Sequence, residues 1–177
     1  FSPYLRLAGR GSATPFVLVD AQELKLHLPA GSVVVDAAFL KQPPKVVPPL
    51  TFEPGAQALT VDGAGYRGEV ELKQKPGGWM AVNVVGIELY LRGVVPSEAP
   101  GGWHEQTYEA QAVAARSYAL AMLHPNADFD LYPNQRSQVY GGIAAETTAT
   151  DLAIAATTGQ VLVWRDQIIP AYYFSSS

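Results

Sequence analysis

Residues 105–123, with the sequence EQTYEAQAVAARSYALAML, contain neither glycine nor proline and are rich in alanine. Alanine has the highest intrinsic helix propensity, whereas glycine and proline have the lowest, so this stretch predicts one long α-helix. Because small or apolar residues also occupy its other faces, we expect the helix to be buried almost all round. A helical period of 3.6 residues defines its main face, which consists of Ala110, Val113, Ala114, Ser117, Leu120 and Ala121.

The N-terminal part of the chain has the character of β structure. Proline, glycine and aspartate separate short runs rich in valine and leucine, as is typical of strands and turns. A proline-rich segment, residues 42–50, excludes a helix or a central strand and predicts an extended connector after a β-rich part at residues 1–50. The strand-like runs are PFVLVD at 15–20, LKLHL at 24–28 and SVVVDAAFL at 32–40.

Residues 58–95 predict an antiparallel meander that leads up to the long helix. Its strand-like runs are separated by turn sequences at Asp62–Gly63 and at residues 76–78. After the helix, residues 124–142 are polar and rich in proline and asparagine, which is typical of a surface loop or a binding loop.

The C-terminal part predicts one more helix and a hairpin. The helix is expected at residues 150–158, with Thr150 as its N-cap and Gly159 at its end. The hairpin is expected to turn at Arg165–Asp166. Together these elements predict an α+β fold in a single domain, residues 1–177.

Composition excludes several classes of function. Hydrophobic residues make up 48% of the 177 residues and charged residues 16%, so a compact globule is expected. The net charge of −4, without any run of lysine or arginine, argues against nucleic acid as the main partner. There is no cysteine, the three histidines lie far apart, and no apolar run has the roughly 20 residues of a membrane span. We therefore expect no metal site, no cofactor and no transmembrane segment.

The stretch VVPSEAPGGW, residues 94–103, places one carboxylate, Glu98, between Pro96 and Pro100. The simplest interpretation is a solvated acid in a loop. The prolines, however, restrict the backbone on both sides, and the glycines at 101–102 allow close approach of a ligand or another segment. Partial desolvation would favour the protonated acid that a general acid requires, whereas pairing with Arg116 would give a structural ion pair. The pattern leaves both possibilities open.

Two polar residues of the long helix, Gln111 and Arg116, require partners if the helix is buried, because an unpaired amide or guanidinium is costly there. They lie five positions apart, on opposite flanks of the apolar stripe. The spacing alone favours a structural role in tying neighbouring loops to the helix over a role in binding. For Tyr118 and Tyr140, half-buried core positions are the corresponding interpretation.

Several motifs follow one another from Tyr66 to the end of the chain, namely YRGEVEL, YLRGVVPSEAP, AQAVAARSYAL, SQVYGG and TTGQVLVWRDQIIPAYYFSSS. In this order they resemble the SpoIID/LytB domain family, that of stage II sporulation protein D and the amidase enhancer LytB.

This resemblance implies a domain of the bacterial cell envelope or extracellular space. The first residues contain no signal-like segment, so we expect no export signal within this chain. SpoIID-like members are lytic transglycosylases, which cleave peptidoglycan glycan strands and leave 1,6-anhydro-MurNAc ends. LytB-like members imply instead a non-catalytic, peptidoglycan-binding module with a cell-wall amidase as partner. Glycan strands are the expected ligand in both cases.

The family motifs also assign roles to individual residues. The catalytic glutamate of the family falls on Glu98, where Ala99 replaces the methionine that follows it in the family. The glutamine and arginine of A-Q-A-x-A-A-R fall on Gln111 and Arg116, which are expected to shape or line the cleft. Gln138 and Tyr140 belong to the Q-V-Y-G-G motif and are expected to contact substrate.

The remaining expectations concern the transition state, the sugar polymer and the zinc site of some members. Tyr140 and Ser175 are candidates to stabilise the charge of the transition state, and Trp103 and Tyr118 are aromatics that suit a sugar polymer. Zinc ligands of some sporulation members fall on Tyr132 and Arg136 here, so the resemblance implies no metal. The family also continues beyond the segment that ends at Ser177, so the C-terminal end of its domain is expected to be missing from this chain.

Overall fold

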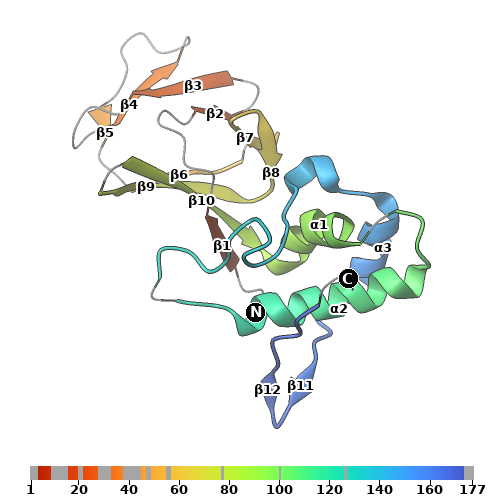
Figure 1. The fold of residues 1–177 in the computed structure, drawn as a ribbon. Coiled ribbons are helices and arrows are strands. Elements are labelled where there is room, and N and C mark those ends of the chain that lie inside the picture. Colours follow the sequence, from red (N-terminus) through yellow and green to blue (C-terminus); the bar gives the residue numbers. More distant parts are fainter. Residues whose placement is uncertain are drawn as a thin grey trace.

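The computed structural model of the chain describes residues 49–54, 57–76, 78–99, 101–125 and 127–173 and, for the backbone alone, five strands between residues 4 and 46 and residues 78–79. Two antiparallel sheets lie beside a group of helices (Figure 1). The predicted α+β class is therefore confirmed. No helix within the described residues is long and apolar enough to cross a membrane.

The two sheets are built from the first ten strands, which are β1 (Tyr4–Ala8), β2 (Phe16–Val19), β3 (Gln22–His27), β4 (Val33–Ala37), β5 (Lys45–Val46), β6 (Leu50–Phe52), β7 (Leu59–Val61), β8 (Ala64–Tyr66), β9 (Glu69–Lys75) and β10 (Gly78–Gly86). One sheet has the order β5-β4-β3-β2-β7-β8 and the other β1-β10-β9-β6. Because β1 pairs with β10 and β2 pairs with β7, strands from the predicted N-terminal part share both sheets with later strands. In the predicted connector, β5 lies at a sheet edge, where proline is tolerated, and residues 42–44 and 47–48 lie outside the described residues.

The alternation that predicted strands is visible in β9, where Val70 and Leu72 are buried and Glu69 and Glu71, which alternate with them, are partly exposed. The predicted turn at Asp62–Gly63 is confirmed. Both residues have positive φ angles, 49° and 80°, which suits the tight turn between β7 and β8. Strands β9 and β10 pair from Lys75 opposite Gly78, and Gly77 of the other predicted turn lies outside the described residues.

The end of the predicted meander is wrong, because residues Ile87–Glu98 form a helix, α1, that follows β10 directly. The segment is rich in branched apolar residues and contains Pro96, which obscured its helical period. The buried positions nevertheless recur at i, i+3, i+4, i+7 and i+8, as one face of a helix requires. They are Ile87, Tyr90, Leu91, Val94 and Val95.

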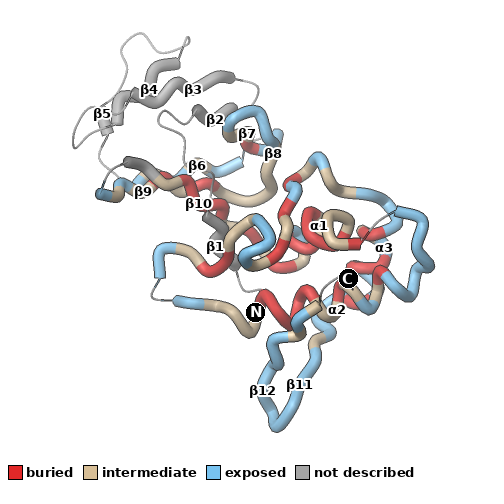
Figure 2. Tube along the Cα trace, viewed as in Figure 1, coloured by how far each residue is buried: buried red, intermediate tan, exposed pale blue. Residues whose placement is uncertain are grey.

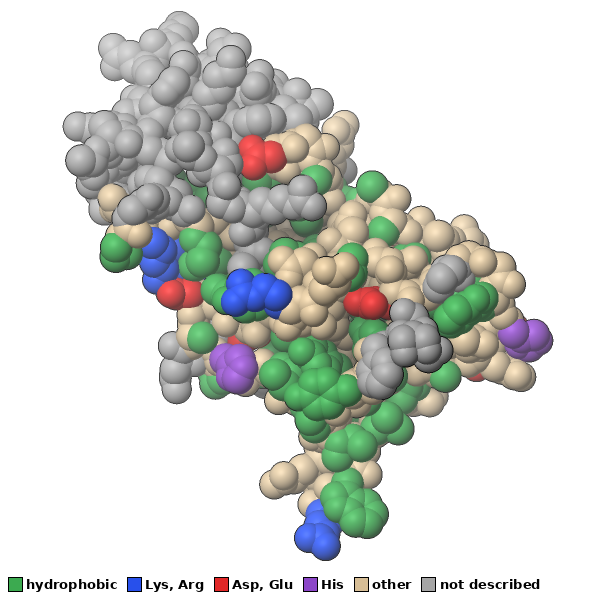
Figure 3. Space-filling model, in the orientation of Figure 1, with side chains coloured by type: hydrophobic (Ala, Val, Ile, Leu, Met, Phe, Trp, Pro, Cys, Tyr) green, Lys and Arg blue, Asp and Glu red, His purple; other side chains and the backbone are tan. Residues whose placement is uncertain are grey.

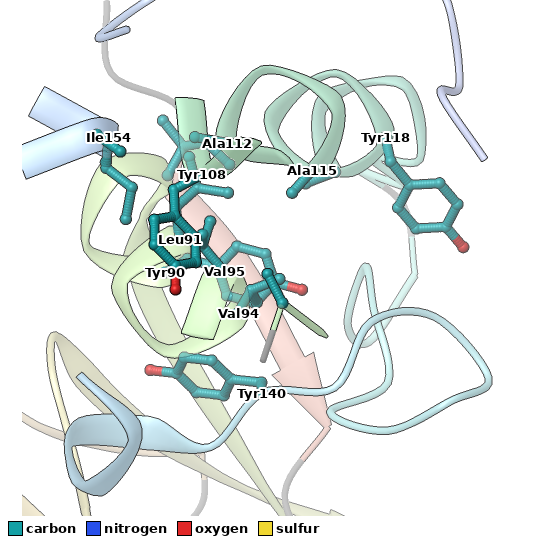
Figure 4. Close-up of a cluster of buried hydrophobic side chains, with 14 of the residues drawn as sticks. Tyr90, Leu91, Val94, Val95, Tyr108, Ala112, Ala115, Tyr118, Tyr140 and Ile154 are labelled. Atoms are coloured by element: carbon teal, nitrogen blue, oxygen red, sulfur yellow. The ribbon is translucent and has the colours of Figure 1, made fainter. Parts of the chain in front are cut away.

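The long helix predicted at 105–123 is confirmed as α2, Glu105–Ala121. The expected burial almost all round is found only in its middle, Ala115–Ala119, and is wrong for residues 105–107, which are exposed. The predicted main face is also wrong, because Tyr108, Ala112 and Ala119 are buried, whereas Ala110 is exposed and Leu120 and Ala121 are only partly buried. Alanine on both faces made the apolar stripe difficult to locate. Figure 2 shows the buried residues concentrated where α1 and α2 meet, and Figure 4 shows their side chains packed together.

After α2, the chain forms a 3-10 helix, η1 (Gly142–Ala145), a third helix, α3 (Thr148–Ala156), and the strands β11 (Val163–Trp164) and β12 (Gln167–Ile168). The predicted second helix is confirmed, but its cap is Thr147, whose side chain accepts a hydrogen bond from the Thr150 amide. Both threonines are favourable caps, which explains the displaced start. The predicted hairpin is confirmed with its turn at Arg165–Asp166, and it projects from the helices (Figure 1).

Candidate functional site

Glu98 is the last residue of α1 and is half-buried rather than placed in a loop. Pro96 has no amide hydrogen to donate, and the helix ends two residues later, where the Ala99 amide donates to the Val95 carbonyl at 2.9 Å. The helix macrodipole disfavours a carboxylate at this end, so Glu98 does not stabilise α1 through its charge.

The carboxylate of Glu98 is held by a main-chain amide. Its Oε1 accepts a hydrogen bond from the Val139 N–H at 2.6 Å. Among the described residues, no hydrogen bond or ion pair engages Oε2. Pairing with Arg116, one of the two possibilities left open by the sequence, does not occur, because that guanidinium pairs with Glu88. One oxygen of Glu98 is thus fixed and the other is available to a ligand.

The loop that supplies the Val139 amide is docked on α1 through contacts that only glycine allows. A Cβ at Gly93 would lie 2.5 Å from a ring carbon of Tyr140, so the absence of a side chain lets that ring pack on the helix. The Gly141 amide donates to the Gly93 carbonyl at 3.0 Å. At Gly142, where φ is +63°, a Cβ would lie 2.6 Å from the Gly65 carbonyl oxygen. The segment QVYGG therefore positions the acid by fitting closely against α1.

Glu98 opens onto a cleft of about 380 Å³, a size within the usual range for ligand sites. Three tyrosines and the loop at residues 135–139 line it, and Glu98 is the one carboxylate among the described lining residues. Tyr118 lies at the edge of the packed cluster with its hydroxyl directed away from it (Figure 4), and Tyr172 packs edge-on against it at 5.6 Å. The lining residues are Glu98, Tyr118, Gln135, Arg136, Ser137, Gln138, Val139, Tyr172 and Tyr173.

Gln138 links the floor of the cleft to α1 and α2. It is buried, accepts a hydrogen bond from the Tyr90 hydroxyl at 3.0 Å, and donates to the Ala115 carbonyl and to the Tyr173 hydroxyl at 2.7 Å. Because the Tyr173 oxygen accepts this bond, its own proton is free to donate into the cleft. Burial raises the pKa of Tyr173 well above its ordinary value, and the nearby charge of Glu98 raises it further, so the hydroxyl stays protonated.

The other residues that the sequence singled out occupy different places. Tyr118 lines the cleft, whereas Trp103, which is about half exposed, is not among the lining residues. Gln111 has a buried Nε2 close to the Tyr173 hydroxyl but without a well-formed hydrogen bond among the described residues. Ser175 lies outside the described residues.

Arg116 is fully buried, and its guanidinium is hydrogen-bonded to other residues of the chain. It forms a two-bond ion pair with Glu88, at 2.9 and 2.8 Å, and donates to the Gln160 carbonyl at 3.0 Å. Tyr140 is also buried and donates a hydrogen bond to Asn83 at 3.3 Å. Both residues support the elements that carry Glu98, and neither lines the cleft.

Sequence reasoning missed three residues of the site, Val139, Tyr172 and Tyr173. The Val139 amide carries no side-chain signature, but Tyr172 and Tyr173 were visible as a pair of aromatics after Pro170. It also missed the ion-pair network that holds η1 and α3 against α1, because this network joins residues far apart in the sequence. Its members are Arg67, Arg92, Glu146 and Asp151.

At the positions where the resemblance places zinc ligands, the side chains form a stack. The Arg136 guanidinium lies 3.8 Å above the ring of Tyr132. The rings of Tyr132 and Phe129 pack in a T-shaped arrangement, with a distance of 4.9 Å between their centroids. In the described part of the chain, no group of three or more histidine, cysteine, aspartate or glutamate residues could hold a metal ion.

Comparisons with known proteins connect this arrangement to one family. The family model SpoIID, described as "Stage II sporulation protein", matches residues 75–164, which include α1, α2, η1 and α3. The matched segment contains Glu98, the QVYGG loop and most of the cleft. It ends at Trp164, before Tyr172 and Tyr173.

Three curated relatives are similar to part of this chain. An uncharacterized protein of Brachyspira hyodysenteriae is 31% identical over 118 residues, which cover 65% of this chain and 32% of the relative. The amidase enhancer of Bacillus subtilis is 35% identical over 88 residues, which cover 49% of this chain and 12% of the relative. Stage II sporulation protein D of Bacillus subtilis is 30% identical over 114 residues, which cover 55% of this chain and 33% of the relative. The alignments thus span a third or less of these relatives, and no solved structure matches the chain.

Proposed function

Because the chain belongs to the SpoIID family of stage II sporulation proteins, we propose that it processes bacterial peptidoglycan by cutting the glycan strand as a lytic transglycosylase. The observation that carries this proposal is the position of Glu98. It is the one carboxylate among the described cleft residues, and the Val139 amide orients it through a hydrogen bond. Such a substrate places the site of action in the cell envelope or outside the cell.

A single carboxylate favours this reaction over ordinary hydrolysis. Most glycoside hydrolases need two carboxyl groups, one to protonate the leaving oxygen and one to activate water or attack the sugar. In the proposed reaction, Glu98 donates its proton to the glycosidic oxygen as the bond from C1 of the muramyl residue breaks. The carboxylate then takes the proton of the C6 hydroxyl, whose oxygen bonds to C1. The products are a free 4-hydroxyl and a 1,6-anhydro ring, no water is consumed, and Glu98 regains its proton.

The walls of the cleft support the proposed substrate. Tyrosine rings present flat apolar faces that pack against sugar rings, while their hydroxyls can hydrogen-bond to sugar oxygens. Tyr173 lies close enough to Glu98 to be affected by its charge and keeps a proton to donate. A donor at this position can stabilise oxygen atoms of the substrate as charge develops in the transition state.

We assign supporting roles to the predicted substrate-binding residues. Gln138 fixes Tyr173, and the unsatisfied Nε2 of Gln111 is available to an oxygen of a bound sugar once side chains adjust. Arg116 and Tyr140 act indirectly by holding α1, α2 and the loop in place. Ser175 remains a predicted contact.

The test is digestion of purified peptidoglycan, followed by mass spectrometry of the soluble products. The wild-type protein should release fragments with 1,6-anhydro-muramyl ends, and Glu98→Gln should reduce their rate of formation by roughly 10² to 10⁴-fold, the usual contribution of general acid–base catalysis. Glu53→Gln removes an exposed carboxylate elsewhere and should leave the rate unchanged. Products with reducing muramyl ends, or equal activity of wild type and Glu98→Gln, would contradict the mechanism.

The similarity to a protein named amidase enhancer favours a second candidate function. In that case the cleft binds glycan strands and the protein stimulates a cell-wall amidase without cutting the strand itself. Both wild type and Glu98→Gln would then bind insoluble peptidoglycan in a sedimentation assay and release no anhydro-muramyl products. Stimulation of an added cell-wall amidase by both proteins would establish this alternative.

A further inference from the structure

The lining of the cleft includes a cation, Arg136, whose backbone is held by its loop. Several bonds close that loop: the Tyr132 amide donates to Ser137 Oγ at 3.1 Å, the Arg136 amide donates to Asn134 Oδ1 at 3.0 Å, and the Val139 amide is bound to Glu98. Arg136 therefore belongs to the same folded loop that aims the acid.

The side chain of Arg136 is oriented as well as positioned. Its guanidinium stacks on the Tyr132 ring at 3.8 Å, and Phe129 packs against that ring from another side. Stacking uses the face of the guanidinium and leaves the N–H groups at its edge available for a bidentate acceptor. Among the described residues, no carboxylate forms an ion pair with Arg136, although acidic residues outnumber basic ones in the chain, 16 to 12. The cation lines the cleft with Glu98 and has no charged partner among the residues that the structure describes.

A carboxylate is the ligand that matches this geometry, because its two oxygens accept the parallel N–H groups of arginine. Peptidoglycan strands alternate two N-acetylated sugars that differ in one substituent. The muramyl residue carries a lactyl group that ends in a carboxylate, or in a stem peptide with carboxylates of its own. A cleft that recognises only N-acetyl groups and sugar rings cannot distinguish the two alternating glycosidic bonds.

We propose that Arg136 binds a carboxylate carried by the muramyl residue and thereby sets the register of the strand, so that the bond leaving muramyl C1 lies at Glu98. This inference rests on the proposed function, since it assumes a peptidoglycan ligand. It adds a specificity-determining residue and names the chemical group that it recognises. Arg136 does not take part in proton transfer.

The test measures binding on a Glu98→Gln background, which prevents turnover. The probes are peptide-free glycan strands, the same strands with stem peptides, and N-acetylglucosamine hexamers, which lack any carboxylate. Arg136→Gln should weaken binding of a muramyl strand by about 10-fold, the lower end expected for a charge-assisted bond at an exposed site, and leave the hexamer unaffected. Loss confined to peptide-free strands identifies the lactyl carboxylate, and loss confined to peptide-bearing strands identifies the stem peptide.

Two further variants separate charge from structure. Arg136→Lys keeps the charge but not the planar fork, and should show an intermediate loss. Arg165→Gln removes an exposed arginine that also lies over an aromatic ring, 5.7 Å from that of Trp164, but outside the cleft lining, and should bind as the parent does. Equal loss of the hexamer and the muramyl strands with Arg136→Gln, or no loss of either, overturns the inference.

The proposed function and the register inference fail in different ways. With Glu98 intact, a protein that makes anhydro-muramyl products while Arg136→Gln keeps the same affinity and the same ratio of cleaved bonds retains the function and refutes the register role. If binding depends on the charge at position 136 but no anhydro-muramyl product forms, the carboxylate site is supported and the transglycosylase activity is refuted. If no probe binds, both are refuted.

Discussion

The substitution Arg116→Met distinguishes a structural role of this arginine from the direct contact with substrate that the family motif allows. Methionine keeps an unbranched chain in a fully buried position and removes the guanidinium. Two charge-assisted bonds to Glu88 and one bond to the Gln160 carbonyl are lost, together with two longer bonds of 3.5 Å to the carbonyls of Ala112 and Ile154. Bonds of this kind contribute about 1.5–3 kcal/mol each. Glu88 is 31% exposed, however, and water can solvate its carboxylate after the change.

We therefore expect Arg116→Met to lower the free energy of unfolding by about 3 kcal/mol, near the low end for breaking a buried pair. Urea denaturation followed by circular dichroism measures this change, with linear extrapolation to zero denaturant. Arg165→Met on the exposed hairpin is the matched control and should change stability by no more than about 0.5 kcal/mol. Under conditions where Arg116→Met is folded, it should still bind peptidoglycan.

The reasoning is refuted if Arg116→Met unfolds at the same urea concentration as wild type while its binding of glycan strands is lost. Arg116 would then contact substrate, and the buried ion pair would contribute little to the fold. A double-mutant cycle with Glu88→Gln provides an independent check, since a coupling energy near zero would also contradict the assigned contact.

Three other perturbations address the site and its support. Gly93→Ala should lower the free energy of unfolding by about 1–3 kcal/mol although alanine has the higher helix propensity, because the added Cβ would lie 2.5 Å from the packed ring of Tyr140. The same variant should lose cleavage activity. Unchanged urea unfolding would show that the loop is not docked as described. Tyr173→Phe should reduce cleavage by about 10-fold, because it removes the hydroxyl that can donate to a ligand. It should also lower the free energy of unfolding by about 1 kcal/mol, because Gln138 Nε2 loses that hydroxyl as an acceptor. Activity equal to wild type would exclude the hydroxyl from the reaction. Burial raises the pKa values of Tyr90, Tyr140 and Tyr173 above the ordinary 10.0, so above that pH the folded state keeps protons that the unfolded state releases. The free energy of unfolding should therefore fall as the pH rises above 10.0, and Tyr140→Phe should make that fall shallower. A steeper fall for the variant, or a gain in stability with pH, in urea titrations would contradict the assignment.

The fold was predictable where local chemistry determined it. Alanine content fixed the position of α2 to within two residues, and left-handed turn sequences marked Asp62–Gly63 and Arg165–Asp166. α1 was missed because valine, leucine and Pro96 resemble a strand that ends in a loop, although its buried positions have a helical period. Propensity is a weak guide where tertiary packing decides the structure.

The candidate site was predictable in part. Motif resemblance identified Glu98 and Gln138, which meet in the cleft. No pattern in the sequence could reveal that a main-chain amide orients the acid, or that Arg116 selects Glu88 rather than Glu98 as its partner. Both depend on how α1, α2 and the loop pack, and this packing is a property of the assembled chain.

The amide that grips Glu98 belongs to the backbone of residue 139, so it is present whatever side chain stands there, proline excepted. Position 139 is thereby open to substitution in a way that its glycine neighbours are not. A saturation library at this codon should retain function for most amino acids and lose it for proline. If the proposed function holds, position 139 is a place where the preference for a ligand can be redesigned without moving Glu98.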